Sequence, residues 1–418
     1  MYGFYLSNSD DIDLSSLRVA LINHIYAKRN KKDFVLIAED DGGEVVEILS
    51  LFGIECKRVL RVYRNLKFYR HFATNLLMNK RAFACFCTDE EIARKKKKAK
   101  QNNTTYFYDG TCERLNDKEV LNNENPFSIR IKKPKESAGF YDEINKEVSF
   151  KPNVIDSFII LKKDKTPTYD FACAIDDMLD DIDFIIKDKK YMVNTIKQKI
   201  IRDYLGYKKK IKYAHIPQLI VEKEEFLNIK NLLENGFLPS AIVNYLLSLG
   251  NNNISEKIFD LRDAETWFEI REISKTATKF DIEKLKQINK EHIKVMDTQK
   301  LASFIGYSSK NIGKLIKFYT KDYSTIKEIK EKIDTIFSLK TPNKNDAKDS
   351  FLLRDIIQKA PTFDKFEEFS EYLLQKSGFD KERLLELLGF LMTGCKSGPN
   401  LNELYIYLKD DIKEITRG

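Results

Sequence analysis

The fold class follows from residues 3–38, GFYLSNSDDIDLSSLRVALINHIYAKRNKKDFVLIA. Residues 3–6 predict a short buried strand, and apolar side chains then recur at spacings of three and four from Leu14 to Ile25, which is typical of a helix. The unbroken apolar run from Phe34 to Ala38 predicts a second strand. A strand, a helix and a strand in this order are typical of a parallel α/β sheet.

This arrangement also predicts where a binding site lies. Ligands of parallel sheets bind at the carboxyl ends of the strands. The segments that follow the two strands, Tyr5 to Asp13 and Glu39 to Gly42, should therefore line the site. Both segments are rich in acidic residues.

The composition indicates a soluble protein of several domains. The chain has 418 residues, of which 42% are hydrophobic, which is enough for several packed cores. No run approaches the length of about 18 apolar residues that a membrane span needs, and the first residues lack the pattern of a signal peptide. We therefore expect a cytoplasmic protein with no membrane partner. A net charge of +8 allows a polyanionic partner without requiring one.

The character of the sequence changes after Pro217. Before it, short apolar runs predict further strands at 171–175, FACAI, and at 184–186, FII. From Phe226 onward nearly every segment has the spacing of an amphipathic helix. Residues 340–348, KTPNKNDAK, lack that spacing and predict an exposed connection.

Eight segments, taken in order, carry a resemblance to one family. They are SLRVALINHIYAK, LIAEDD, CFC followed by YDGTC, TPTYDFACAIDD, YAHIPQL, NGFLPSAIVNYLLSLG, ATKFDIEKLKQIN and LMTGCKSGPNLNEL. Each segment is weak evidence alone, but the shared order over the whole chain is specific. The sequence resembles the bacterial glutamyl-tRNA synthetases, which are class I synthetases.

The resemblance implies a multidomain fold that combines α/β and all-α parts. It implies a split Rossmann-type parallel-sheet domain at 1–72 and 184–222, an inserted α+β acceptor-end domain at 73–183, a helical stem-contact domain at 223–298, and an α-helical anticodon-binding-like domain at 299–418.

Two departures from the family pattern concern ATP. In the family, a His-Ile-Gly-His-like element supports the ATP phosphates and leaves room for adenine; here that stretch is Asp13-Leu14-Ser15-Ser16. The Asp13 carboxylate should face the triphosphate with like charge, and two added side chains should enter the space that glycine leaves. A Lys-Met-Ser-Lys-Ser-like loop, whose lysine holds the pyrophosphate, is missing between Leu219 and Leu238. Losing two such groups should slow adenylation by about 10⁴-fold. We therefore expect that the chain uses no ATP and is not a working aminoacyl-tRNA synthetase.

The amino acid pocket of the family is altered in this sequence. The family's arginine on the first strand is Gly3, and its second pocket arginine, in an Arg-Gly-Glu-Asp-like sequence, corresponds to Lys187 in Lys187-Asp188-Lys189-Lys190. Asp170 replaces an asparagine. The positions that match the family are Ser7, Glu39, Tyr169 and Asn194. Either a different amino acid-like ligand binds there, or these residues are relics held by packing.

A second constellation consists of Cys85, Cys87, Tyr108 and Cys112. Three thiolates and a phenol suit one tetrahedral zinc, and some members of the family bind zinc through such a set in the acceptor-end insertion. We expect a structural zinc. The alternative is that Cys85 and Cys87 lie on opposite faces of a strand, with one of them simply buried.

Other motifs predict packing more than chemistry. The aspartates from Asp176 to Asp183 lack the glycine and the final glutamate of a calcium loop, so they predict a turn or a cap. The four histidines stand in no short triad-like motif and predict satisfied polar side chains.

Three functions fit these observations. The leading hypothesis is a catalytically degenerate paralogue recruited as a binding, regulatory or assembly protein, whose partner is a protein, tRNA or a small amino acid-like ligand. The second is an enzyme of altered chemistry that acts on an amino acid-like substrate in the altered pocket. The third is a module that only binds tRNA.

Overall fold

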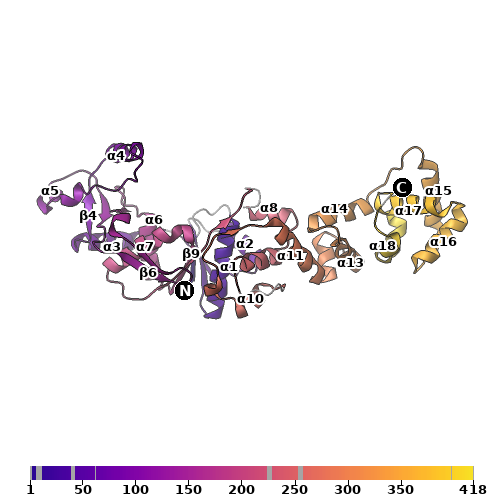
Figure 1. Cartoon of the computed structure of the whole chain (residues 1–418), viewed down its shortest axis with the longest axis horizontal. Helices are drawn as coiled ribbons and strands as arrows, with labels where there is room; N and C mark the ends of the chain where they lie inside the picture. Colours follow the sequence, from indigo (N-terminus) through magenta and orange to yellow (C-terminus); the bar gives the residue numbers. More distant parts are fainter. Residues whose placement is uncertain are drawn as a thin grey trace. The chain divides into compact units, whose positions relative to one another are not determined.

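The computed structural model describes residues 2–5, 12–38, 43–61, 63–223, 228–252, 258–396 and 398–417 (Figure 1). Its contacts divide the chain into two units. The first comprises residues 1–229 and 246–280, and the second comprises residues 230–245 and 281–418.

The first unit is built on a parallel sheet. Within the described residues its strand order is β3-β2-β1-β9-β10-β6-β7, and only the pair β6–β7 is antiparallel. The predicted α/β class is therefore confirmed. The strands are β1 (Tyr2–Tyr5), β2 (Phe34–Ala38), β3 (Arg58–Arg61), β6 (Ala138–Asp142), β7 (Lys146–Phe150), β9 (Phe184–Asp188) and β10 (Lys212–Ile216).

Two smaller sheets complete the strands of this unit. An antiparallel sheet contains β4 (Ala82–Cys85), β5 (Ser128–Ile131) and β8 (Ile159–Leu161), and a short parallel pair contains β11 (Leu219–Ile220) and β12 (Thr278–Lys279). The hairpin β6–β7 comes from the segment that we expected to form the insertion, yet it pairs with β10 in the main sheet.

The helices of the first unit alternate with its strands from β1 to β4 and less regularly after that. They are α1 (Leu14–Arg29), α2 (Gly43–Leu51), α3 (Leu66–Met78), α4 (Asp89–Gln101), α5 (Asp117–Leu121), α6 (Tyr169–Leu179), α7 (Met192–Tyr204) and α10 (Leu261–Trp267). Helices α8 (Ile229–Glu234) and α9 (Pro239–Ser248) each contain residues of both units.

Helix α1 is fixed at both ends. The carboxylate of Asp13 accepts the backbone N–H of Ser16 at 2.6 Å, which caps the first turn. At the other end, the guanidinium of Arg29 donates to the carbonyls of Thr266, at 2.9 Å, and of Phe268, at 2.5 Å, at the end of α10. Because α1 also packs on β1 and β9, its first turn is held at the carboxyl edge of the sheet.

Helix α6 corrects one prediction. The run FACAI was expected to form a strand, but it lies in the helix that begins after Thr168. Its residues Phe171 to Ile175 are all buried, so no polar position reveals the helical period. Of the aspartates that follow, Asp176 and Asp177 belong to the helix: Asp176 accepts the Tyr69 hydroxyl at 2.8 Å, and Asp177 pairs with Arg202 at 2.9 Å. The prediction of a turn or cap holds for Asp180, which caps the end of α6, and for Asp181 in the turn after it.

The second unit is helical, as predicted. Its further helices are α11 (Ile282–Val295), α12 (Thr298–Phe304), α13 (Lys310–Tyr319), α14 (Ile326–Phe337), α15 (Ala347–Lys359), α16 (Phe366–Ser377), α17 (Lys381–Thr393), α18 (Leu401–Leu408) and α19 (Ile412–Ile415). Leucine and isoleucine side chains from these helices form one apolar core. Residues 343–345 are exposed as predicted for a connection, but Lys340 is buried.

Hydrophobic length was also checked along the helices. Over the described ranges, none is long and apolar enough to cross a membrane.

Candidate functional site

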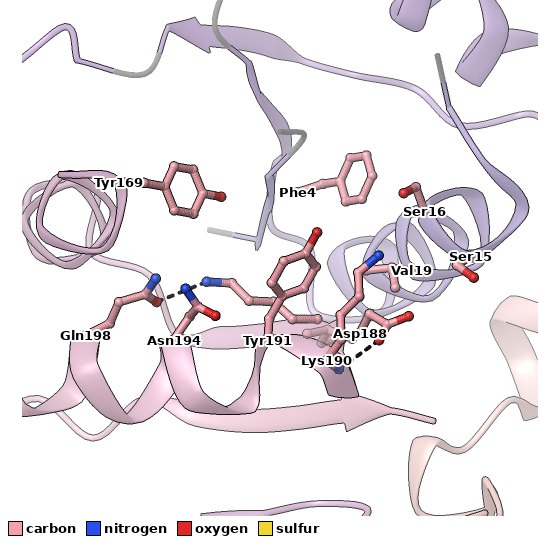
Figure 2. A pocket seen from close by; sticks show the side chains of 12 residues that line it. Phe4, Ser15, Ser16, Val19, Tyr169, Asp188, Lys190, Tyr191, Asn194 and Gln198 are labelled. Carbon is pink, nitrogen blue, oxygen red and sulfur yellow. Dashed lines mark hydrogen bonds between the residues drawn. The ribbon is translucent and has the colours of Figure 1, made fainter. Parts of the chain in front are cut away.

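A cavity lies where β1 and β9 end, beside the first turn of α1 (Figure 2). This is the edge at which parallel sheets bind their ligands. The residues that line it are Phe4, Ser15, Ser16, Val19, Tyr169, Ile186, Lys187, Asp188, Lys190, Tyr191, Asn194 and Gln198. Figure 2 shows Tyr169 pointing into the opening from α6, opposite the side chains that α1 presents.

A polar network surrounds the ammonium of Lys187. This ammonium, on a residue only 8% exposed, donates to Gln198 Oε1 at 3.0 Å. The amide nitrogens of Gln198 and Asn194 donate to one carboxylate oxygen of Asp170, at 3.3 and 2.9 Å. Lys197 lies 3.7 Å from the other oxygen of that carboxylate. The pocket therefore offers a buried cation together with an ordered carboxylate beside it.

Tyr169 supplies a neutral hydroxyl. Burial, followed by the neighbouring Cys173, raises the pKa of Tyr169 well above its ordinary value. The phenol therefore remains protonated at neutral pH, and its hydroxyl is hydrogen-bonded to Cys173.

Helix α7 is held in place by a buried hydrogen-bonded chain. Thr195 Oγ1 lies 2.8 Å from His215 Nε2, and His215 Nδ1 lies 2.6 Å from Asp142 Oδ2. His215 and Asp142 have no exposed surface, so the chain cannot contact a substrate. Its effect is to fix the neighbours of Thr195 on α7, which include Asn194 and Gln198.

The structure brings together part of the predicted pocket. Tyr169, Lys187 and Asn194 line the cavity, and Asp170 joins them through its hydrogen bonds. Ser7 and Glu39 lie outside the described residues. Sequence reasoning missed Gln198, although its spacing of four from Asn194 places both on one helix face, and it also missed Tyr191 and Lys190.

The stretch Asp13 to Ser16 differs from its prediction in one respect. We expected the Asp13 carboxylate to face the phosphates of a nucleotide, but it caps α1, while Leu14 is fully buried. Ser15 and Ser16 do line the cavity, which exists in their presence. The side chains of Ser15 and Ser16 therefore narrow the cavity without filling it.

The cysteine cluster brings three sulfurs close enough together to hold one metal ion. The sulfurs of Cys85, Cys87 and Cys112 all lie within 4.8 Å of one another, and those of Cys87 and Cys112 are 3.7 Å apart. Two sulfurs on one zinc, each ~2.3 Å from it, are expected ~3.8 Å apart. The Tyr108 hydroxyl lies 3.5 Å from the sulfurs of Cys85 and Cys87, which also suits a fourth ligand.

The structure also bears on the alternative that Cys85 and Cys87 lie on opposite faces of one strand. Strand β4 ends at Cys85, so Cys87 lies beyond it and strand alternation no longer separates the two thiols. Burial opposes ionisation of Cys85, but hydrogen bonds from Tyr108 and Arg130 outweigh burial and lower the pKa of this thiol. Burial raises the pKa of Cys87 to about 11. The donor set fits a metal that favours sulfur.

Comparison with known proteins decides the family. Residues 13–287 match the family described as tRNA synthetases class I (E and Q), catalytic domain. The chain is 42% identical to "Glutamate--tRNA ligase 1" of Campylobacter curvus, over 99% of this chain and 100% of the relative. It is 40% identical to "Glutamate--tRNA ligase 2" of Sulfurimonas denitrificans, over 100% of both.

The chain belongs to the class I glutamyl- and glutaminyl-tRNA synthetase family. A solved glutamate tRNA ligase of Elizabethkingia meningosepticum shares the fold, with a TM-score of 0.81 and 20% identity, over 99% of this chain and 97% of that one.

Membership of this synthetase family corrects the functional prediction. We expected a chain without enzyme activity that uses no ATP. Full-length identity of 40–42% to proteins named as ligases contradicts both expectations and indicates an active aminoacyl-tRNA synthetase.

Proposed function

We propose that this synthetase joins glutamate to tRNA at the expense of ATP. The observation that carries the proposal is the likeness to glutamate–tRNA ligases over the whole chain. The cavity supports it, because a buried ammonium at Lys187 is suited to the side-chain carboxylate of glutamate. The Asp170 carboxylate beside Asn194 would attract the α-ammonium group of the same amino acid.

The reaction requires two transfers. An oxygen of the glutamate α-carboxylate forms a bond to the α-phosphorus of ATP, while the bond from this phosphorus to the bridging oxygen breaks and pyrophosphate leaves with the electron pair. A ribose hydroxyl of the tRNA then attacks the acyl carbon, loses its proton and displaces AMP. The role of the pocket is to hold glutamate still and to offset the charge that develops on phosphate.

The test is ATP–pyrophosphate exchange, with glutamate, glutamine and aspartate compared in the presence and absence of tRNA. We expect exchange above background with glutamate alone among the three. The N194A variant, which removes an amide donor from Asp170, is expected to reduce it. If the wild-type chain gives neither exchange nor charged tRNA under any of these conditions, the proposal is wrong.

We further propose that Cys85, Cys87, Tyr108 and Cys112 bind one structural zinc. The measured separations support this set, and all four side chains are buried, with no position left for a substrate. Zinc would tie the end of β4 to the short helical turn Cys112–Arg114. Its role is to hold this part of the chain together.

Zinc content and thermal stability test this second proposal. We expect about one zinc per wild-type chain, a loss of most of it in C112S, and retention in the matched control C395S. Removal of zinc by a chelator should lower the unfolding temperature, because a metal at a hundred times its Kd stabilises the folded state by about 2.7 kcal/mol. Equal zinc content in C112S and wild type would exclude the proposed ligand set.

A further inference from the structure

Lys190 places a second cation in the pocket. It follows β9 in the short turn Lys189–Tyr191, and the Asp188 carboxylate fixes the backbone there by accepting the N–H of Lys190 at 2.9 Å. In Figure 2 the Lys190 side chain extends away from this turn toward the side of α1 that carries Ser16 and Val19.

Two cations line the pocket. Among its described lining residues the charged groups are Lys187, Asp188 and Lys190, and the Asp170 carboxylate lies beside them, bound by Asn194 and Gln198. Lys187 is directed to Gln198, and Asp188 accepts the backbone N–H of Lys190. The Lys190 ammonium has no carboxylate within ion-pair distance in the described part of the chain, and it lies 5.1 Å from the Tyr191 ring centroid.

The opposite wall adds neutral donors. Ser15 and Ser16 line the cavity from the first turn of α1. A hydroxyl can donate to a phosphate oxygen without adding charge. The Asp13 carboxylate accepts the Ser16 N–H, and Asp13 is not among the residues that line the cavity.

We propose that Lys190 binds the phosphate chain of the nucleotide, in place of the lysine loop that this sequence lacks. The inference rests on the proposed ligase function for the identity of the nucleotide. As the bond between the α-phosphorus and the bridging oxygen breaks, negative charge grows on the leaving pyrophosphate. The Lys190 ammonium would offset that charge, and the Ser15 and Ser16 hydroxyls would donate to the same oxygens.

The direct experiment measures binding of inorganic pyrophosphate and of ATP to the full chain by calorimetry. Wild type is compared with K190M, K190R and the control K189M, whose lysine is exposed and donates to the Lys275 carbonyl at 3.2 Å. We expect K190M to weaken pyrophosphate binding by about 10- to 100-fold, as for loss of a charged hydrogen bond. K190R should retain most of the affinity, and K189M should remain within about twofold of wild type.

Several outcomes overturn the inference. They are a pyrophosphate affinity of K190M equal to that of wild type, a loss of affinity in K189M equal to that in K190M, or no binding of pyrophosphate by wild type. Unfolding temperatures of the variants within about a degree of wild type exclude a folding defect as the cause of a lost affinity. The exchange assay separates this inference from the proposed function. Exchange at the wild-type rate in K190M refutes the role of Lys190 and leaves the ligase function standing. Pyrophosphate binding that depends on Lys190, without exchange in wild type, refutes the ligase function alone.

Discussion

Lys187 is a charged residue of the pocket that is also buried. Its ammonium is held by Gln198, which also donates to Asp170. A buried lysine needs an anion or several acceptors to offset the loss of hydration. Because Lys187 lines the cavity, a carboxylate ligand could pair with its ammonium, so Lys187 should determine which amino acid is accepted.

Substitution of Lys187 tests whether this side chain selects the amino acid. K187M should raise the KM for glutamate by about 10- to 100-fold, because one charged hydrogen bond to the substrate is lost. K187R keeps the charge and should retain most of the activity. The measurement is the glutamate dependence of pyrophosphate exchange, with K189M as the surface control. An unchanged KM in K187M would place the glutamate carboxylate elsewhere.

Individual residues were predictable to different degrees. Tyr169, Lys187 and Asn194 were identified from the resemblance to the synthetase family, and all three line the cavity. The role of Asp13 was wrong, because a short acidic side chain before a helix bonds to its own backbone when the first turn offers a free N–H. That local hydrogen bond removes the carboxylate from the cavity.

At the level of elements, Lys340 shows how a polar segment can become part of a core. Its ammonium donates to the carbonyls of Ile336, in α14, and of Ile415, in α19; the second distance is 3.0 Å. Arg354 of α15 donates to the Lys340 carbonyl. The residue therefore satisfies carbonyls of two helices, although its sequence predicts an exposed connection.

The ionisation of Lys340 predicts a pH dependence of stability. Burial, reinforced by Arg354, lowers its pKa from 10.5 to about 8 in the folded chain. Between about pH 8 and pH 10.5 the unfolded state therefore binds more protons at this residue, so its contribution to the free energy of unfolding increases as the pH rises. The full effect is about 3 kcal/mol.

The comparison of wild type with K340M isolates this group. Denaturant unfolding at several pH values should show the stability of wild type rising relative to K340M between about pH 8 and pH 10.5, and a constant difference below about pH 7. A difference that is flat throughout would show that the ammonium keeps its ordinary pKa in the folded chain.

On the scale of the whole molecule, the order of the matching segments along the chain supports family membership as much as any single motif does. Segments spread from the first helix to the last described turns match the same relatives along the full chain. The described residues contain the parallel sheet, the antiparallel sheet with its cysteines and the helical second unit. The prediction of lost activity rested on two short segments, Asp13 to Ser16 and Leu219 to Leu238. The full-length match to proteins named as ligases contradicts it.

The sequence by itself determined the parallel α/β core, the helical second unit and the family, and it singled out the three cysteines that the structure brings together. Periodicity and spacing are local properties, so they can be read along the chain. Only the tertiary structure decided that FACAI is helical, that Asp13 turns back onto α1, and that Lys190 reaches the cavity. These outcomes depend on which side chains come into contact in the folded chain. Such contacts are set by packing between segments that are far apart in sequence.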